Sequence, residues 1–66
     1  MSLSDIPVGL LNRLGQNERA MKNFVQLTAD QQKEITSYIQ SSQSGDTALQ
    51  RIEETISRLS GYQNFS

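Results

Sequence analysis

The sequence contains no cysteine, no histidine and no tryptophan, and it has a single proline among its 66 residues. Without cysteine there is no disulfide, and without Cys or His clusters there is no structural zinc site to stabilise a small chain. The usual general base and the thiol nucleophiles are missing too, so we expect no enzyme, no cofactor and no small-molecule substrate. Asp30 and Glu34 are too few oxygen ligands for a metal ion, so we expect no metal site.

An excess of one charge and long hydrophobic runs are also absent. Six Lys and Arg stand against seven Asp and Glu, which gives a net charge of −1. Nucleic acids and anionic membranes require a dense basic field, so we do not expect either as the partner. No stretch approaches the roughly 20 apolar residues of a membrane span, and the first residues lack the features of a secretory signal. We therefore expect a cytoplasmic protein.

The chain is short and contains few apolar residues. Its hydrophobic content is 35% over 66 residues, and a core of this size rarely supplies more than about 3 to 5 kcal/mol. We expect one domain over residues 6–60, between a polar lead of residues 1–5 and a tail of residues 61–66. Such a domain is either a marginally stable monomer or a homo-oligomer that buries further surface by association.

The clearest helix start lies in the middle of the chain. Thr28 stands three residues before Gln31, which is the spacing of a capping box. Behind this cap, Ile35, Tyr38 and Ile39 fall at helical spacing and form one apolar edge. The pattern predicts a helix from residue 29 to residue 40 or 41.

Two shorter helices are predicted before it. Pro7 suits the first turn of a helix, with Ser4 or Asp5 as its cap. Gly15 is expected to end that helix in the left-handed conformation, and Asn17 is a good cap for the next one. The second of these helices has to end near Leu27. The apolar faces of the two helices hold Ile6, Leu10, Leu11, Leu14, Ala20, Met21 and Phe24.

A Ser-rich loop over residues 41–45 precedes a fourth predicted helix. Ser44 and Asp46 are both possible caps for it, and propensity does not choose between them. Gly61 is expected to close this helix, and Tyr62 and Phe65 follow in the tail. Along the helix, Glu54 and Arg58 are spaced as a favourable i,i+4 pair, and the apolar stripe consists of Leu49, Ile52, Ile56 and Leu59.

These four segments predict an all-α protein, a small orthogonal bundle of four short helices, because no stretch alternates between apolar and polar residues. The predicted core contains Leu10, Leu14, Met21, Phe24, Leu27, Ile35, Tyr38, Ile39, Leu49, Ile52, Ile56 and Leu59.

Three residues are candidates for contact with a partner, namely Arg51, Arg58 and Tyr38. The two arginines are seven residues apart and project from the same side of the fourth helix. With Lys33 or Arg19 they could hold a phosphate or a carboxylate of a partner, although ion pairs with neighbouring glutamates explain such side chains more often. Tyr38 is explained as a core residue with its hydroxyl at the rim.

The order of features over most of the chain resembles the YdeI/OmdA family, described as bacteriocin-protection or OmpD-associated proteins. The resemblance begins at the Ile6-Pro7 start of the first helix and ends at Leu59. Between these points it rests on Leu14, Asn17, Ala20, Phe24, Leu27, the Lys33-Glu34-Ile35 segment, Tyr38-Ile39, Asp46-Thr47, the Arg51-Ile52-Glu53 run and Thr55-Ile56.

The resemblance implies a small helical domain that often stands at the C-terminal end of a longer protein. It favours Ser44 as the cap of the fourth helix, and the family's name implies a part in envelope stress or peptide resistance. This chain departs from the family at Tyr38, where a Trp is common. It also carries Gln43, Ser44 and Ala48 where the family is rich in Lys and Arg.

The leading interpretation is a non-catalytic interaction module of bacterial type that binds a protein partner or itself. The alternative is a regulatory domain that binds nucleic acid or another anion through Arg13, Arg19, Arg51 and Arg58. The short connection between the second and third helices resembles a helix-turn-helix, but Asp30 and Glu34 occupy the helix that would face phosphates.

Overall fold

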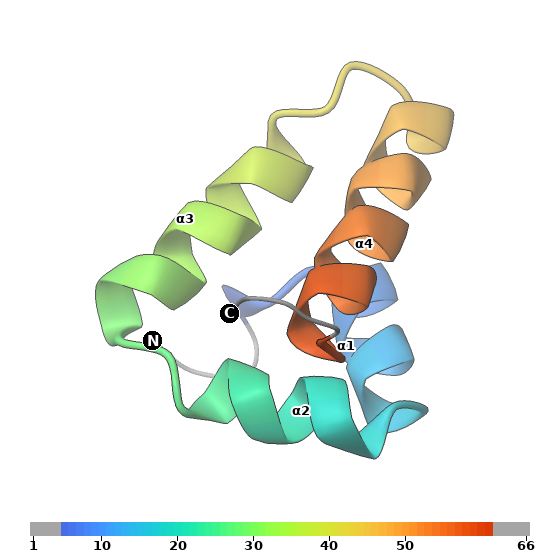
Figure 1. The fold of residues 1–66 in the computed structure, drawn as a ribbon. Helices are drawn as coiled ribbons and strands as arrows, with labels where there is room; N and C mark the ends of the chain where they lie inside the picture. The colour runs from blue at the N-terminus through green and yellow to red at the C-terminus, as the bar shows by residue number, and fades with distance from the viewer. Residues whose placement is uncertain (1–4, 62–66) are drawn as a thin grey trace.

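The computed structural model describes residues 5–61, and this part of the chain holds four α-helices and no strand. They are α1 (Val8–Gly15), α2 (Glu18–Val25), α3 (Ala29–Gln40) and α4 (Gly45–Leu59). In Figure 1, α3 and α4 run side by side from the loop that joins them, and α2 crosses below their far ends. The predicted all-α bundle of four short helices is confirmed.

The longest helix, α4, is the centre of the bundle, because it packs against each of the other three. α1 and α2 also pack against each other, whereas the main contact of α3 is with α4. α3 is therefore held mainly by one neighbour. The buried apolar side chains are Ile6, Leu10, Leu14, Ala20, Phe24, Ile39, Ile52, Ile56 and Leu59.

Most of the predicted core is confirmed, but two of its members were wrong. Leu49 is 54% exposed and Tyr38 is 44% exposed. Leu49 lies on the apolar stripe of α4 but near the start of the helix. In Figure 1 this end of α4 extends beyond α1 and α2. Ile6 and Ala20 are buried, although the predicted core omitted them. The other members that are only partly buried against the core are Met21, Leu27 and Ile35.

The start of α1 differs from the prediction. Pro7 is the N-cap residue of α1, with φ −52° and ψ 136°, and it makes no side-chain capping hydrogen bond. Asp5 therefore does not occupy the cap position, and Ser4 lies outside the described residues. Within α1, a Cβ added at Gly9 would lie 2.9 Å from Cδ1 of Ile52. The missing side chain at position 9 thus allows α1 to lie close against α4.

The two corners that follow are formed by predicted caps. Asn17 Oδ1 accepts a hydrogen bond from the Ala20 N–H at 3.0 Å. Thr28 and Gln31 form the full capping box, with N···O distances of 3.1 and 3.0 Å. α2 ends at Val25, two residues before the predicted limit, because the chain needs residues 26 and 27 to turn into the cap of α3.

The structure also decides how α1 and α4 end. Gly15 is the last residue of α1 and is not left-handed; the chain leaves the helix through Gln16 at φ −98°, so the predicted glycine cap was wrong. Gly61 does adopt a left-handed φ of 71° after α4. Ser44, not Asp46, caps the start of α4, since its Oγ accepts from the Thr47 N–H at 3.2 Å. Tyr62 and Phe65 lie outside the described residues.

Candidate functional site

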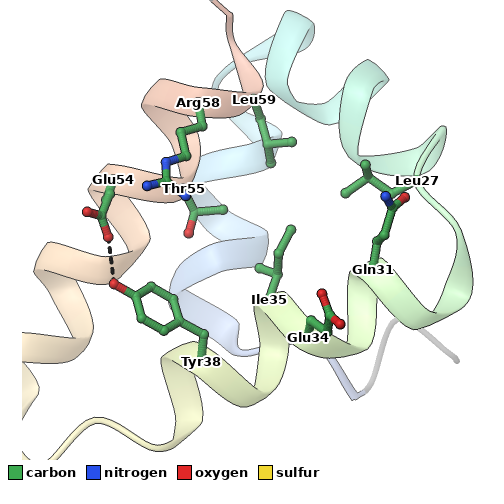
Figure 2. Close-up of a pocket in the computed structure, with 9 residues that line it drawn as sticks. All are labelled: Leu27, Gln31, Glu34, Ile35, Tyr38, Glu54, Thr55, Arg58 and Leu59. Atoms are coloured by element: carbon green, nitrogen blue, oxygen red, sulfur yellow. Dashed lines mark hydrogen bonds between the residues drawn. The ribbon is translucent and has the colours of Figure 1, made fainter. Parts of the chain in front are cut away.

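A groove, here called the α3/α4 groove, runs between the two helices and encloses about 560 Å³ (Figure 2). The end of the α2–α3 connection and α3 supply one wall, and α4 supplies the other. Residues three, four and seven positions apart share one helix face, which explains how each wall is assembled. The groove is lined by Leu27, Gln31, Glu34, Ile35, Tyr38, Glu54, Thr55, Arg58 and Leu59.

The floor of the groove is apolar and continuous with the core. Leu59 is a buried member of the core, and Leu27 and Ile35 are partly buried against it. The three side chains come from three different segments of the chain and converge in Figure 2. Apolar side chains that are left partly open in this way favour covering by another apolar group.

Tyr38 stands at the end of the groove nearest the loop. Its hydroxyl donates a hydrogen bond to Glu54 Oε1 at 2.7 Å, which joins α3 to α4. This hydrogen bond raises the pKa of the Tyr38 phenol above its ordinary value, and desolvation and the negative charge of Glu54 act in the same direction. The hydroxyl lies at the rim as predicted. Tyr38 as a whole is too exposed to be the core residue that was predicted.

Arg51 binds the end of α3. Its Nη1 donates to the backbone oxygen of Tyr38 at 2.7 Å and to Ser41 Oγ at 3.2 Å. Its guanidinium also lies 4.5 Å from the centre of the Tyr38 ring, which is cation–π distance. Carbonyl groups at the end of a helix lack partners within the helix. Arg51 satisfies one of them and fixes the ring that closes the groove.

Arg58 belongs to the groove, and the predicted ion pair with Glu54 is not formed. Between residues 5 and 61 the ion pair is that of Arg13 with Glu53, which links α1 to α4. Glu54 accepts from Tyr38 instead. Arg51 and Arg58 therefore have different surroundings: one binds the end of α3, and the other lines the groove.

The remaining cations of the predicted anion site are dispersed. Arg19 lines a shallow depression on α2 together with Lys22, and Lys33 lines depressions along α3 together with Asp30. Arg13 is engaged with Glu53. This arrangement does not assemble one cationic surface from the arginines of the anion-binding alternative. That alternative stays a prediction, which titration with random duplex at low salt would test.

No group of three or more potential metal ligands occurs in the part of the chain that the structure describes. The helices of residues 5–61 include none that is both long enough and apolar enough to cross a membrane.

A small all-α domain with a half-open groove between its last two helices is the class of protein that these observations define. The chain belongs to the OmdA family, described as "Bacteriocin-protection, YdeI or OmpD-Associated", whose model matches residues 4–61. Comparison with curated proteins and comparison with solved structures each give no match.

Sequence reasoning identified Tyr38 and Arg58 but not the groove that they share. The signal was present in the pattern of α3, where Gln31, Glu34, Ile35 and Tyr38 repeat at helical spacing. Only Ile35 and Tyr38 were read as apolar, and both were assigned to a closed core. Whether this face of α3 is buried or exposed depends on which helices pack beside it. The sequence of α3 alone does not reveal this.

Proposed function

We propose that this domain is a non-catalytic interaction module of the YdeI/OmdA type, which holds a segment of a partner protein in the α3/α4 groove. The observation that carries the proposal is the apolar floor of the groove, where Leu27 and Ile35 are only partly buried beside the buried Leu59. A groove between two helices with an apolar floor and polar rims accepts an amphipathic segment, which buries the floor and leaves the rims hydrated.

The polar groups of the groove support a binding role over a catalytic one. The Thr55 hydroxyl donates to the Arg51 backbone oxygen at 2.7 Å, and the Tyr38 hydroxyl donates to Glu54. A nucleophile needs a base that can accept its proton. Thr55 has a backbone carbonyl in that place, and the proton of Tyr38 is held more tightly than usual. We therefore propose that the domain is not an enzyme.

We propose a cellular setting that the family description supports. That description names bacteriocin protection and an association with OmpD, which supports a role in envelope stress or in resistance to peptides. We place the module in the cytoplasm, and cell fractionation would test this placement.

The test compares two variants in which an exposed or partly exposed apolar residue is replaced by glutamine. Ile35→Gln makes the floor polar, whereas Val25→Gln changes a residue of α2 that is 61% exposed and does not line the groove. Immobilised wild type and both variants are incubated with cell lysate, and the retained proteins are quantified by mass spectrometry. Circular dichroism confirms that each variant is helical.

We expect a set of proteins that wild type and Val25→Gln retain and Ile35→Gln loses. Charge reversal of an exposed rim residue, Glu34→Lys, provides a second groove variant that leaves the packing untouched. Retention of the same proteins by all four chains, or a strict monomer that retains nothing, contradicts the proposal.

A further inference from the structure

We infer that the segment bound in the α3/α4 groove is a basic amphipathic helix of the partner protein, two to three turns long. This inference rests on the proposed function and names the chemistry of the partner. It follows from the shape of the groove, from the charges on its rims and from the absence of a suitable helix within residues 5–61.

The shape of the groove fits a helix. On α3 the lining residues extend from Gln31 to Tyr38, which corresponds to about 10 Å of helix at 1.5 Å per residue. The opposite wall, from Glu54 to Leu59 on α4, lies alongside it. Two helices that lie side by side leave a lengthwise furrow, and a third helix can pack its ridge of side chains into that furrow. None of the residues that line the groove belongs to α1 or α2, so these two helices do not fill the furrow.

The rims of the groove carry more negative than positive charge. Glu34 stands on the α3 wall and Glu54 on the α4 wall, while Arg58 is the cation among the lining residues. Neither glutamate belongs to an ion pair within residues 5–61. The hydrogen-bond partner of Glu54 is the uncharged phenol of Tyr38. Both carboxylates are therefore available to Lys or Arg side chains that flank the apolar ridge of a bound helix.

An acidic helix would place its carboxylates beside these two glutamates, and such juxtaposed like charges oppose binding. A second copy of this chain is also a poor match. Besides Tyr38, its exposed large apolar residues in the described part are Val8 on α1, Val25 on α2 and Leu49 on α4. Each helix thus offers one exposed large apolar residue. The apolar ridge of a helix that binds in a groove needs several such residues at intervals of three and four positions.

The experiment uses fluorescently labelled probe helices of roughly 12 residues, about three turns. All probes share one apolar ridge, and their flanking positions carry Lys, Glu or Gln. A fourth probe has the composition of the Lys probe with the apolar residues scrambled. Fluorescence polarisation measures the Kd of each probe for the full chain at low and at moderate salt.

We expect the Lys probe to bind more tightly than the Gln probe. At low salt its Kd should be lower than that of the Glu probe by a factor of about ten or more. Exposed ion pairs of this kind typically contribute about 1.4- to 5-fold in affinity each. Glu34→Gln and Glu54→Gln should each weaken the Lys probe by that factor, and Arg58→Gln should strengthen it. Glu18→Gln removes the same charge from α2, away from the groove, and should change nothing.

Several results would overturn the inference. Tighter binding of the Glu probe would show that the charge preference is wrong, while the proposed function would stand. Equal binding of the scrambled probe, or unchanged binding to Ile35→Gln, would show that the probe does not use the groove. Dimerisation that Ile35→Gln abolishes, measured by light scattering, would identify a second copy as the occupant. If no probe binds, the basic helix is wrong, and the lysate comparison of Ile35→Gln with Val25→Gln decides the proposed function separately.

Discussion

The close approach of α1 to α4 at Gly9 makes a quantitative prediction. A methyl group at position 9 would lie 2.9 Å from Cδ1 of Ile52, which is too close for two carbon atoms. Ile52 is 6% exposed, and its branched Cβ allows essentially one χ1 rotamer in a helix. Cδ1 is the far end of the Ile52 side chain, so it can give way by rotation about χ2 within the core that surrounds it. The substitution Gly9→Ala should create strain to the extent that the core resists this rotation.

Two opposing terms determine the net effect of Gly9→Ala. Replacing Gly by Ala within a helix gains about 1 kcal/mol, whereas an extra methyl group in a packed core costs about 1 to 3 kcal/mol. We expect Gly9→Ala to lower the free energy of unfolding by about 0 to 2 kcal/mol in the wild-type background. Ile52→Val removes the obstructing Cδ1 and alone costs about 0.5 to 1.5 kcal/mol. In that background Gly9→Ala should instead stabilise by about 1 kcal/mol.

Urea unfolding followed by circular dichroism measures the four members of this double-mutant cycle. The expected coupling between positions 9 and 52 is about 1 to 3 kcal/mol, within the range for side chains in contact. Gly15→Ala is the matched control on the same helix, because a Cβ there meets nothing within 4 Å. Its effect should be the same with Ile or Val at position 52. If Gly9→Ala also changes the free energy of unfolding by the same amount with Ile and with Val at position 52, the reasoning is refuted.

Three other perturbations test the core, the buried Thr36 hydroxyl and the hydrogen bond between Tyr38 and Glu54. Ile52→Ala should cost about 2 to 5 kcal/mol, most of the stability of so small a core, so its circular dichroism should show a largely unfolded chain and not a native-like melting curve. Thr36→Val should stabilise the domain by about 1 kcal/mol in urea unfolding, because the buried Thr36 hydroxyl has no hydrogen-bond partner among residues 5–61. A loss of stability would show that the hydroxyl is satisfied. In a Tyr62→Phe chain, titration of tyrosinate absorbance should place the pKa of Tyr38 above 10.0, and Glu54→Gln should lower it. Since the folded-state pKa is raised, the stabilisation from this hydrogen bond is complete below about pH 10 and is lost as the pH rises through the folded-state pKa.

Local sequence signals predicted the helices well because each cap depends on residues three positions apart. The Asn17 cap and the Thr28–Gln31 capping box need no distant partner, and both are formed. Gly15 shows the limit of this reasoning. A glycine at a helix end is compatible with a left-handed cap, but here the chain continues through Gln16 with a negative φ to reach the next cap one residue later.

The candidate site was harder to predict, because it depends on contacts between distant segments. Arg51 and Tyr38 are 13 residues apart, and their contact exists only once the loop has folded α4 back along α3. From the sequence, Arg51 was one of two arginines on a single helix side. Tyr38 was one of three apolar residues on α3. Whether such residues are buried, paired or open is decided by the neighbouring helix, and no property of their own segments reveals it.

The stability of the domain and the occupation of its groove should be linked. The core is small, and the floor residues Leu27 and Ile35 are only partly buried, so the free chain leaves apolar area in water that a bound helix would cover. A partner that binds only the folded state adds RT ln(1 + [L]/Kd), about 2.7 kcal/mol at a hundredfold excess over Kd. This is comparable with the roughly 3 to 5 kcal/mol that a core of this size supplies. Part of the apolar surface whose burial would stabilise α3 thus stays exposed in the free chain. Binding of a partner would bury this surface. A probe helix that binds without raising the urea midpoint would show that it binds the unfolded chain about as tightly as the folded one, so that its binding does not depend on the folded groove.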